Sequence, residues 1–118
     1  MWTNIVNMNN FSTVIKDARQ LSRYKLVDVA KLIGIDKALL SKIEKGQRKA
    51  TRKQVDEFIR FYKLDERLAL SSWLSDKIIY ELHDETFALD ALMLAEDRVK
   101  YNATSKVGFT PDKELKKL

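Results

Sequence analysis

Apolar side chains recur at three- and four-residue spacings along most of the chain, which is the period of an amphipathic helix. Between residues 11 and 23, one such helix face consists of Val14, Ile15, Ala18 and Leu21. Ser12 stands in the position of its N-cap. The same spacing predicts further helices at 27–33, 37–45, 66–82 and 85–101, and a helix that opens at Thr51. The pattern therefore predicts an all-α chain.

Two of these predicted helices, 27–33 and 37–45, are short and meet at a tight turn. Gly34 suits the left-handed C-cap position of the first helix, and Asp36 is a good N-cap for the second. In the second helix Leu40 and Ile43 face inward. Small or cationic residues face outward: Lys37, Ala38, Ser41, Lys42 and Lys45. This is the layout of a helix-turn-helix, in which the second helix is thin enough to enter a DNA major groove ~12 Å wide.

The next predicted helix is preceded by a basic loop. Thr51 and Gln54 form a capping box, and the buried stripe of this helix is Val55, Phe58, Ile59 and Tyr62. The loop and the first turn, residues 46–53, contain four cations: Arg48, Lys49, Arg52 and Lys53. A loop of this charge can lie along a phosphate backbone.

The composition narrows the possible chemistry. The 118 residues include no Cys and a single His, and 45% of them are hydrophobic. Disulfides, Cys-zinc sites and thiol catalysis are therefore excluded, and we expect His83 to be a surface or capping residue. No apolar run reaches the ~18–20 residues of a membrane span. Because residues 1–10 do not resemble a signal peptide, we expect a cytoplasmic protein.

Charge divides unevenly along the chain, whose formal net charge is +5. Residues 16–60 contain 13 basic and six acidic side chains, whereas residues 65–98 contain three basic and nine acidic ones. A basic, compact first half favours a polyanionic partner, because cations near phosphates release condensed counterions. The alternative is that these cations are only a solvated surface, and charge alone does not separate the two.

The order of residues from 29 to 48 closely resembles the phage repressor and Cro-like helix-turn-helix family, also called the XRE family. The likeness includes the Val29-Ala30 pair, the turn at Gly34, and the Ser-x-Ile-Glu-x-Gly stretch that begins at Ser41. It covers about 11–64. The resemblance implies base contacts from Lys37, Ala38, Ser41 and Lys42, and phosphate contacts from Lys45, Arg48 and Lys49. It also implies that Glu44 is structural.

The chain departs from the family pattern at two positions. Leu26 stands where the family commonly has a Gln that touches phosphate, and Ala50 stands where it often has a Pro. We expect the neighbouring Lys25 to supply the phosphate contact in place of the missing Gln.

The acidic second half carries two amphipathic helices whose apolar faces need a partner. Because repressors of the resembling type usually work as dimers, we assign dimerisation to these helices. The candidate residues are Trp73, Ile78, Phe87 and Leu92. The alternatives are that the helices complete the core, or that they bind another protein such as a polymerase subunit or a toxin.

We therefore expect a five-helix repressor-like helix-turn-helix domain followed by an additional C-terminal helix. The predicted divisions are an N-terminal extension at 1–10, the DNA-binding domain at 11–64, a helical pair at 65–101 and a mobile basic tail at 102–118. The expected function is sequence-specific binding of double-stranded DNA by a homodimeric transcriptional regulator, without enzyme activity, cofactor, metal, small-molecule ligand or membrane. The alternatives are an antitoxin or restriction-modification controller of the same fold, and a helical interaction module that does not bind DNA.

Overall fold

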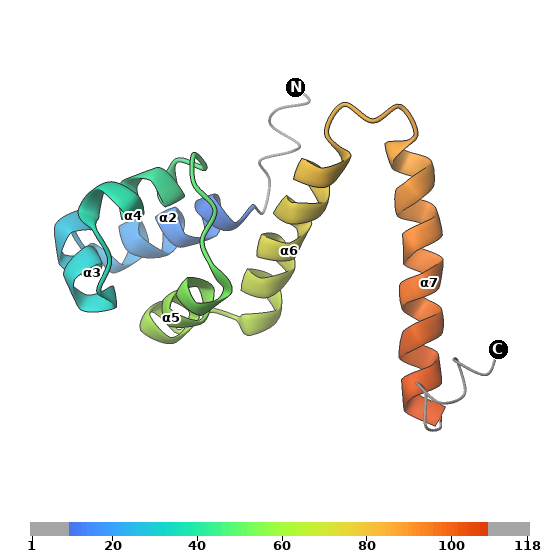
Figure 1. Ribbon diagram of the computed structural model, residues 1–118. Coiled ribbons are helices and arrows are strands. Elements are labelled where there is room, and N and C mark those ends of the chain that lie inside the picture. The colour runs from blue at the N-terminus through green and yellow to red at the C-terminus, as the bar shows by residue number, and fades with distance from the viewer. Residues whose placement is uncertain (1–9, 109–118) are drawn as a thin grey trace. The chain divides into compact units, whose positions relative to one another are not determined.

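The computed structural model describes residues 10–108, and within that range the regular secondary structure is entirely helical (Figure 1). The helices are α2 (Phe11–Ser22), α3 (Leu26–Ile33), α4 (Lys37–Glu44), α5 (Arg52–Tyr62), α6 (Glu66–Leu82) and α7 (Ala88–Gly108). The predicted all-α class and the additional C-terminal helix are confirmed. The chain divides into two compact units, Met1–Glu81 and Leu82–Leu118. No helix in the described range is long and apolar enough to cross a bilayer.

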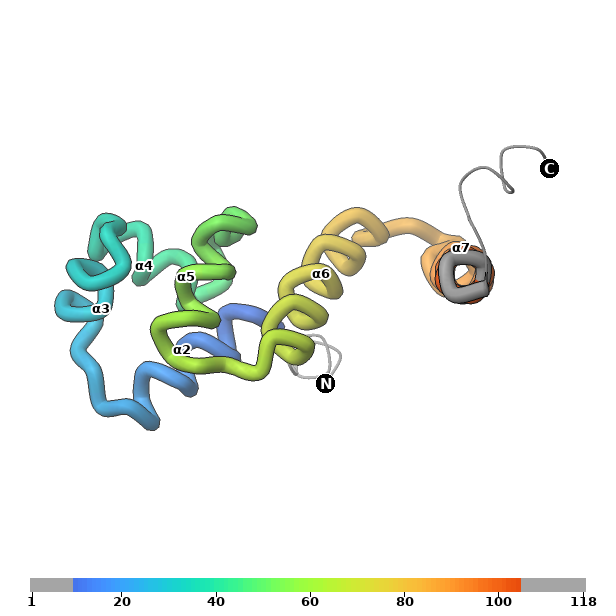
Figure 2. Tube along the Cα trace, turned by 90° about the horizontal axis from the view of Figure 1, so that it is seen from below, coloured from blue at the N-terminus to red at the C-terminus, as the bar shows by residue number. Residues whose placement is uncertain are grey.

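Helices α2 to α6 share one hydrophobic core. Its buried side chains are Phe11, Ile15, Val29, Ala30, Leu40, Ile43, Ala50, Val55, Phe58, Ala69 and Trp73. Phe58 of α5 packs edge-on against Phe11 of α2, with ring centroids 5.9 Å apart. In both views α3 and α4 lie at one end of this unit and α6 lies at the other (Figure 1 and Figure 2).

Helix α6 belongs to this core through two contacts that are distant in sequence. The buried indole Nε1 of Trp73 donates to the Ala50 carbonyl at 2.8 Å. The backbone N–H of Phe11 donates to Asp76 Oδ2 at 3.0 Å. The first unit therefore continues past the predicted boundary at residue 64, and α6 completes its core.

The start and the end of α2 correct two sequence expectations. The N-cap is Asn10, whose Oδ1 accepts from the Thr13 backbone N–H at 2.9 Å, so Ser12 lies inside the first turn. Leu21 was expected on the buried face, but it is 84% exposed. The buried face is centred on Phe11 and Ile15, and Leu21 lies about 80–120° around the helix from them.

The turn between α3 and α4 forms largely as predicted. Gly34 has φ +84°, and its backbone N–H donates to the Ala30 carbonyl at 2.9 Å. A Cβ at Gly34 would meet no atom within 4 Å, so the backbone conformation alone favours glycine there. Asp36 is the N-cap of α4, but its side chain accepts no capping hydrogen bond. The predicted N-cap position is therefore confirmed, whereas the carboxylate of Asp36 is exposed and does not bond the first amides of α4.

The remaining helix ends lie close to the positions that the sequence predicts, except in the second unit. Thr51 and Gln54 form the predicted capping box of α5. Asp65 Oδ1 accepts from the Arg67 backbone N–H at 3.0 Å at the start of α6. Helix α7 begins at Ala88 rather than at residue 85, and it continues to residue 108 instead of ending at 101. The first residues of the expected tail are thus helical, while 109–118 and residues 1–9 of the expected N-terminal extension lie outside the described residues.

Candidate nucleic-acid interface

Helix α4 has two distinct faces. Its inward face carries Leu40 and Ile43, which are fully buried. The predicted base-contacting residues lie within an arc of about 140° on the other side. Lys37, Ala38 and Lys42 are exposed there, and Ser41 is half-buried. The structure therefore brings all four candidates together on one solvent-facing surface.

An ion pair attaches the end of α4 to α2. Arg19 Nε donates to Glu44 Oε2 at 2.8 Å and its terminal nitrogen donates to Glu44 Oε1 at 2.9 Å, so the contact is bidentate. The Glu44 side chain is only 6% exposed, and its hydrogen bond raises the pKa of Arg19 above the ordinary value. The prediction that Glu44 is structural is confirmed. Because Arg19 is committed to this carboxylate, it holds α4 in place rather than facing a ligand.

Tyr62 lies close to both members of this ion pair. Burial, with a further contribution from Glu44, raises the pKa of Tyr62 to about 12. Its hydroxyl is buried and has no hydrogen-bond partner within residues 10–104. The ring stacks on Phe58 with centroids 6.3 Å apart, so Tyr62 acts as a neutral packing residue behind α4.

The basic loop divides into cations that face solvent and one that faces α6. Lys45 and Arg48 are exposed and have no carboxylate within salt-bridge distance among the side chains that the structure describes. Lys49 instead places its Nζ 3.8 Å from the ring centroid of Tyr80 on α6. Such a cation–π contact competes with a phosphate for the same ammonium group. Lys45 and Arg48 therefore face solvent, whereas Lys49 would have to leave the Tyr80 ring to contact a phosphate.

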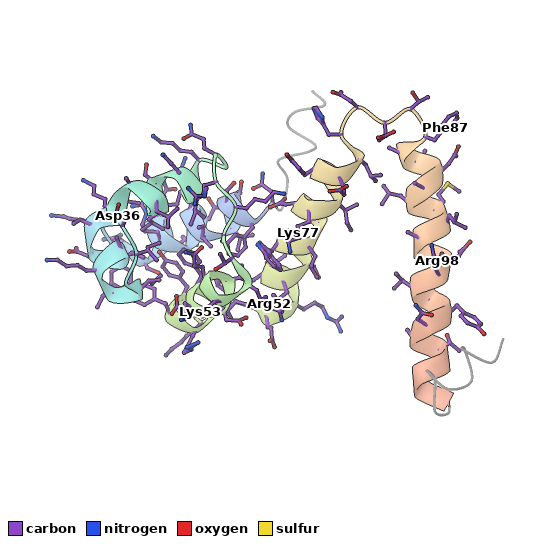
Figure 3. All side chains as sticks on the ribbon, viewed as in Figure 1. Asp36, Arg52, Lys53, Lys77, Phe87 and Arg98 are labelled. Atoms are coloured by element: carbon purple, nitrogen blue, oxygen red, sulfur yellow. The ribbon has the colours of Figure 1, made fainter. Side chains whose placement is uncertain are left out.

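Further cations extend the basic surface at the helix starts. Lys25 occupies the N-cap position of α3 with an exposed side chain. Arg52 and Lys53 lie in the first turn of α5 (Figure 3) and are exposed, although Arg52 also pairs with Asp56 at 3.5 Å. Their place in the first turn of a helix that opens at Thr51 is as the sequence predicted. Residues 10–81 contain sixteen Lys and Arg and ten Asp and Glu, so this part of the chain carries a net positive charge.

One acidic residue interrupts the basic surface near α4. Asp36, at the start of the helix, is exposed (Figure 3) and carries no ion pair among the side chains described. No group of three metal-ligating side chains occurs in the same part of the chain. The chemistry that remains on this surface is hydrogen-bond donation and positive charge, which suits a polyanion.

Comparison with known proteins identifies this arrangement of helices. A family model described as a helix-turn-helix domain matches residues 11–70. The chain belongs to this helix-turn-helix family. The match runs from the start of α2 into α6, so the helix-turn-helix itself is α3, the turn at Gly34, and α4. No curated protein and no solved structure matches the chain. A helix-turn-helix domain indicates a DNA-binding regulator.

The four candidate dimerisation residues lie in different parts of the structure. Trp73 is 7% exposed and part of the helix-turn-helix unit's core, so it is not available to a second copy. Ile78 is exposed on α6, in the first unit. Phe87 and Leu92 belong to the second unit, with Phe87 just before α7 and Leu92 half-buried on it. Of the four, only Leu92 lies on the helix that is outside the first unit's core.

Proposed function

We propose that the protein is a sequence-specific DNA-binding transcriptional regulator of the repressor and Cro-like type. The observation that carries this proposal is the two-faced α4. Its inner side is fixed by Leu40, Ile43 and the Arg19–Glu44 pair, and its outer side carries only small and cationic residues over the predicted arc. A helix held this rigidly can enter a major groove in one register.

Each outward side chain of α4 has a chemistry that a base edge can meet. The ammonium groups of Lys37 and Lys42 donate to guanine N7 and O6 or to adjacent phosphates. The Ser41 hydroxyl donates or accepts, and the Ala38 methyl packs against the methyl group of thymine. Their combination gives preference for one sequence over another.

Phosphate contacts fix the protein on the duplex. Lys25, Lys45 and Arg48 extend from the elements that flank α4, and Lys49 can join them by leaving the Tyr80 ring. A homodimer places two copies of α4 on half-sites about one DNA turn apart. Repression follows when the dimer occupies a promoter. An antitoxin or a restriction-modification controller would use the same surface on a different operator.

The first experiment is selection of bound sites from a random duplex library. We expect enrichment of an inverted repeat with half-sites about one turn apart. Absence of any enriched sequence would contradict the proposal and would support a helical interaction module that does not bind DNA.

Two single substitutions separate base contacts from phosphate contacts. We expect Lys42→Ala to relax base preference at one position of each half-site, and Arg48→Ala to weaken binding to all sequences and to reduce the salt slope by about 1. The control is Lys77→Ala, which makes the same change in charge on α6, at the other end of the unit from α3 and α4 (Figure 3). Titration of selected and scrambled duplexes at several salt concentrations measures all three. A uniform loss in both Lys42→Ala and Arg48→Ala would show that Lys42 does not contact bases.

A further inference from the structure

Helix α6 holds two consecutive residues of the basic loop. The indole of Trp73 donates to the Ala50 carbonyl at 2.8 Å, and both residues are buried. The ammonium group of Lys49 lies 3.8 Å from the ring centroid of Tyr80. The backbone of the loop is therefore fixed to α6 at residue 50, and the cation that precedes this point is directed to the same helix.

The groups that hold this loop lie along one stripe of α6. Trp73, Asp76 and Tyr80 are three and four residues apart, so their side chains leave the helix on the same side. Burial raises the pKa of Asp76, and both its hydrogen bond from Phe11 and the nearby charge of Lys49 oppose that rise. The ammonium group of Lys49 is thus attracted by a ring face and by a carboxylate one helical turn away.

Lys49 differs in this respect from the other cations predicted to contact phosphate. Lys25, Lys45 and Arg48 are exposed and form no ion pair and no cation–π contact among the side chains that the structure describes. Helix α6 lies at the opposite end of the first unit from α3 and α4 (Figure 1 and Figure 2). An ammonium group over the Tyr80 ring is therefore directed away from a duplex that α4 contacts.

We propose that Tyr80 is a positioning residue that holds Lys49 away from the DNA backbone, and that Lys49 leaves the ring when the basic loop binds phosphate. DNA binding then costs the cation–π contact, so the ring lowers the affinity of the loop for every duplex, whatever its sequence. This role of Tyr80 rests on the part of the proposed function in which the loop contacts phosphate. It adds a residue of α6 that sets the strength of that contact.

The contact between Lys49 and Tyr80 is measurable without DNA. Protons above an aromatic ring are shifted upfield in a proton NMR spectrum, so we expect this shift for the Lys49 methylene protons beside the ammonium group. Tyr80→Phe keeps the ring and should keep the shift, whereas Tyr80→Leu should remove it. Added duplex should remove the shift in the wild type. A free wild type without the shift, or a shift that persists in the DNA-bound protein, would overturn the proposal.

The affinity of full-length variants for DNA tests the consequence of this contact. We expect Tyr80→Leu to bind the selected duplex and a scrambled duplex about two- to fivefold more tightly, because no exposed cation–π contact has to be broken. Tyr80→Phe is the matched control and should bind like the wild type. In a Lys49→Ala background, Tyr80→Leu should have no effect on affinity, because no ammonium group remains for the ring to hold.

Unchanged or weaker binding by Tyr80→Leu would overturn the proposal. An equal gain with and without Lys49 would also overturn it, because Tyr80 would then act through the packing of α6. If either result comes with a kept preference for the selected duplex, the proposed function stands. Equal affinity for the selected and scrambled duplexes would contradict sequence-specific regulation, whereas a gain in Tyr80→Leu that depends on Lys49 would still support the role of Tyr80.

Discussion

The two units of this chain are both helical, but they differ in how far their apolar side chains and ion pairs are buried. The first unit buries eleven apolar side chains in one core, whereas α7 buries none of those described. Each unit also has an ion pair of similar length. Arg19 and Glu44 lie 2.8 Å apart with side chains 19% and 6% exposed, and Lys100 and Glu96 lie 3.0 Å apart with side chains 70% and 61% exposed. Because the distances are nearly equal, burial decides what each contact contributes to stability.

The largest expected effect comes from breaking the buried pair. Arg19→Met leaves the Glu44 carboxylate buried without a partner, and we expect a loss of about 3 kcal/mol in the free energy of unfolding. The matched variant on α7, Lys100→Met, removes an exposed pair and should change it by less than about 0.5 kcal/mol. Urea unfolding followed by circular dichroism measures both.

A double variant measures the cost of leaving the buried carboxylate unpaired. Arg19→Met combined with Glu44→Met removes both charges, so we expect it to be less destabilised than Arg19→Met alone. Equal losses in the free energy of unfolding from Arg19→Met and Lys100→Met would contradict this account. They would mean that the burial of Glu44 adds nothing to the contribution of its ion pair.

A smaller effect is expected where α6 joins the first unit. Trp73→Phe removes the indole N–H and leaves the Ala50 carbonyl without its buried donor, at a cost of about 1–2 kcal/mol in the free energy of unfolding. Phe87→Leu is the matched change of an aromatic residue in the second unit, where the side chain is 73% exposed. It should be near neutral. If Trp73→Phe were also neutral, α6 would not be part of the first unit's core.

The smallest effect depends on pH. Burial raises the pKa of Asp76, against the opposing effects of its hydrogen bond from Phe11 and of Lys49. The folded protein therefore binds this proton more tightly than the unfolded chain, and the stability that the group contributes is lost as pH rises from 3.8 through the raised pKa. Asp76→Asn keeps an acceptor for the Phe11 N–H but does not titrate.

The melting temperatures of the wild type and Asp76→Asn test this sign across acidic to neutral pH. We expect the variant to gain relative to the wild type as pH rises. Asp97→Asn makes the same change in net charge on α7 and serves as the control for that change. A relative loss of stability in Asp76→Asn toward neutral pH would show that the ionised carboxylate stabilises the fold.

The parts of this structure that the sequence predicted are those set by local chemistry. Gly34 at a left-handed position, the Thr51–Gln54 capping box and the two faces of α4 each depend on residues within one or two turns of each other. The carboxylate of Asp36 was the exception, because an exposed helix start can bind water instead of a cap.

The parts that the sequence did not predict depend on residues far apart in the chain. Trp73 meets Ala50 across 23 residues, and Asp76 meets the start of α2 across 65 residues. The family resemblance implies a phosphate contact for Lys49, but the contact of Lys49 with the Tyr80 ring depends on the packing of α6. Periodicity shows that a helix has an apolar face, but it does not show which element covers that face.

The most direct test of the central claim is the affinity of the full chain for its selected DNA site against a scrambled duplex of the same length, at near-physiological salt. A regulator that reads bases through α4 should prefer the selected site by at least ~10³-fold. Equal affinity for the two duplexes would mean that the basic surface binds phosphate only, and it would contradict sequence-specific regulation.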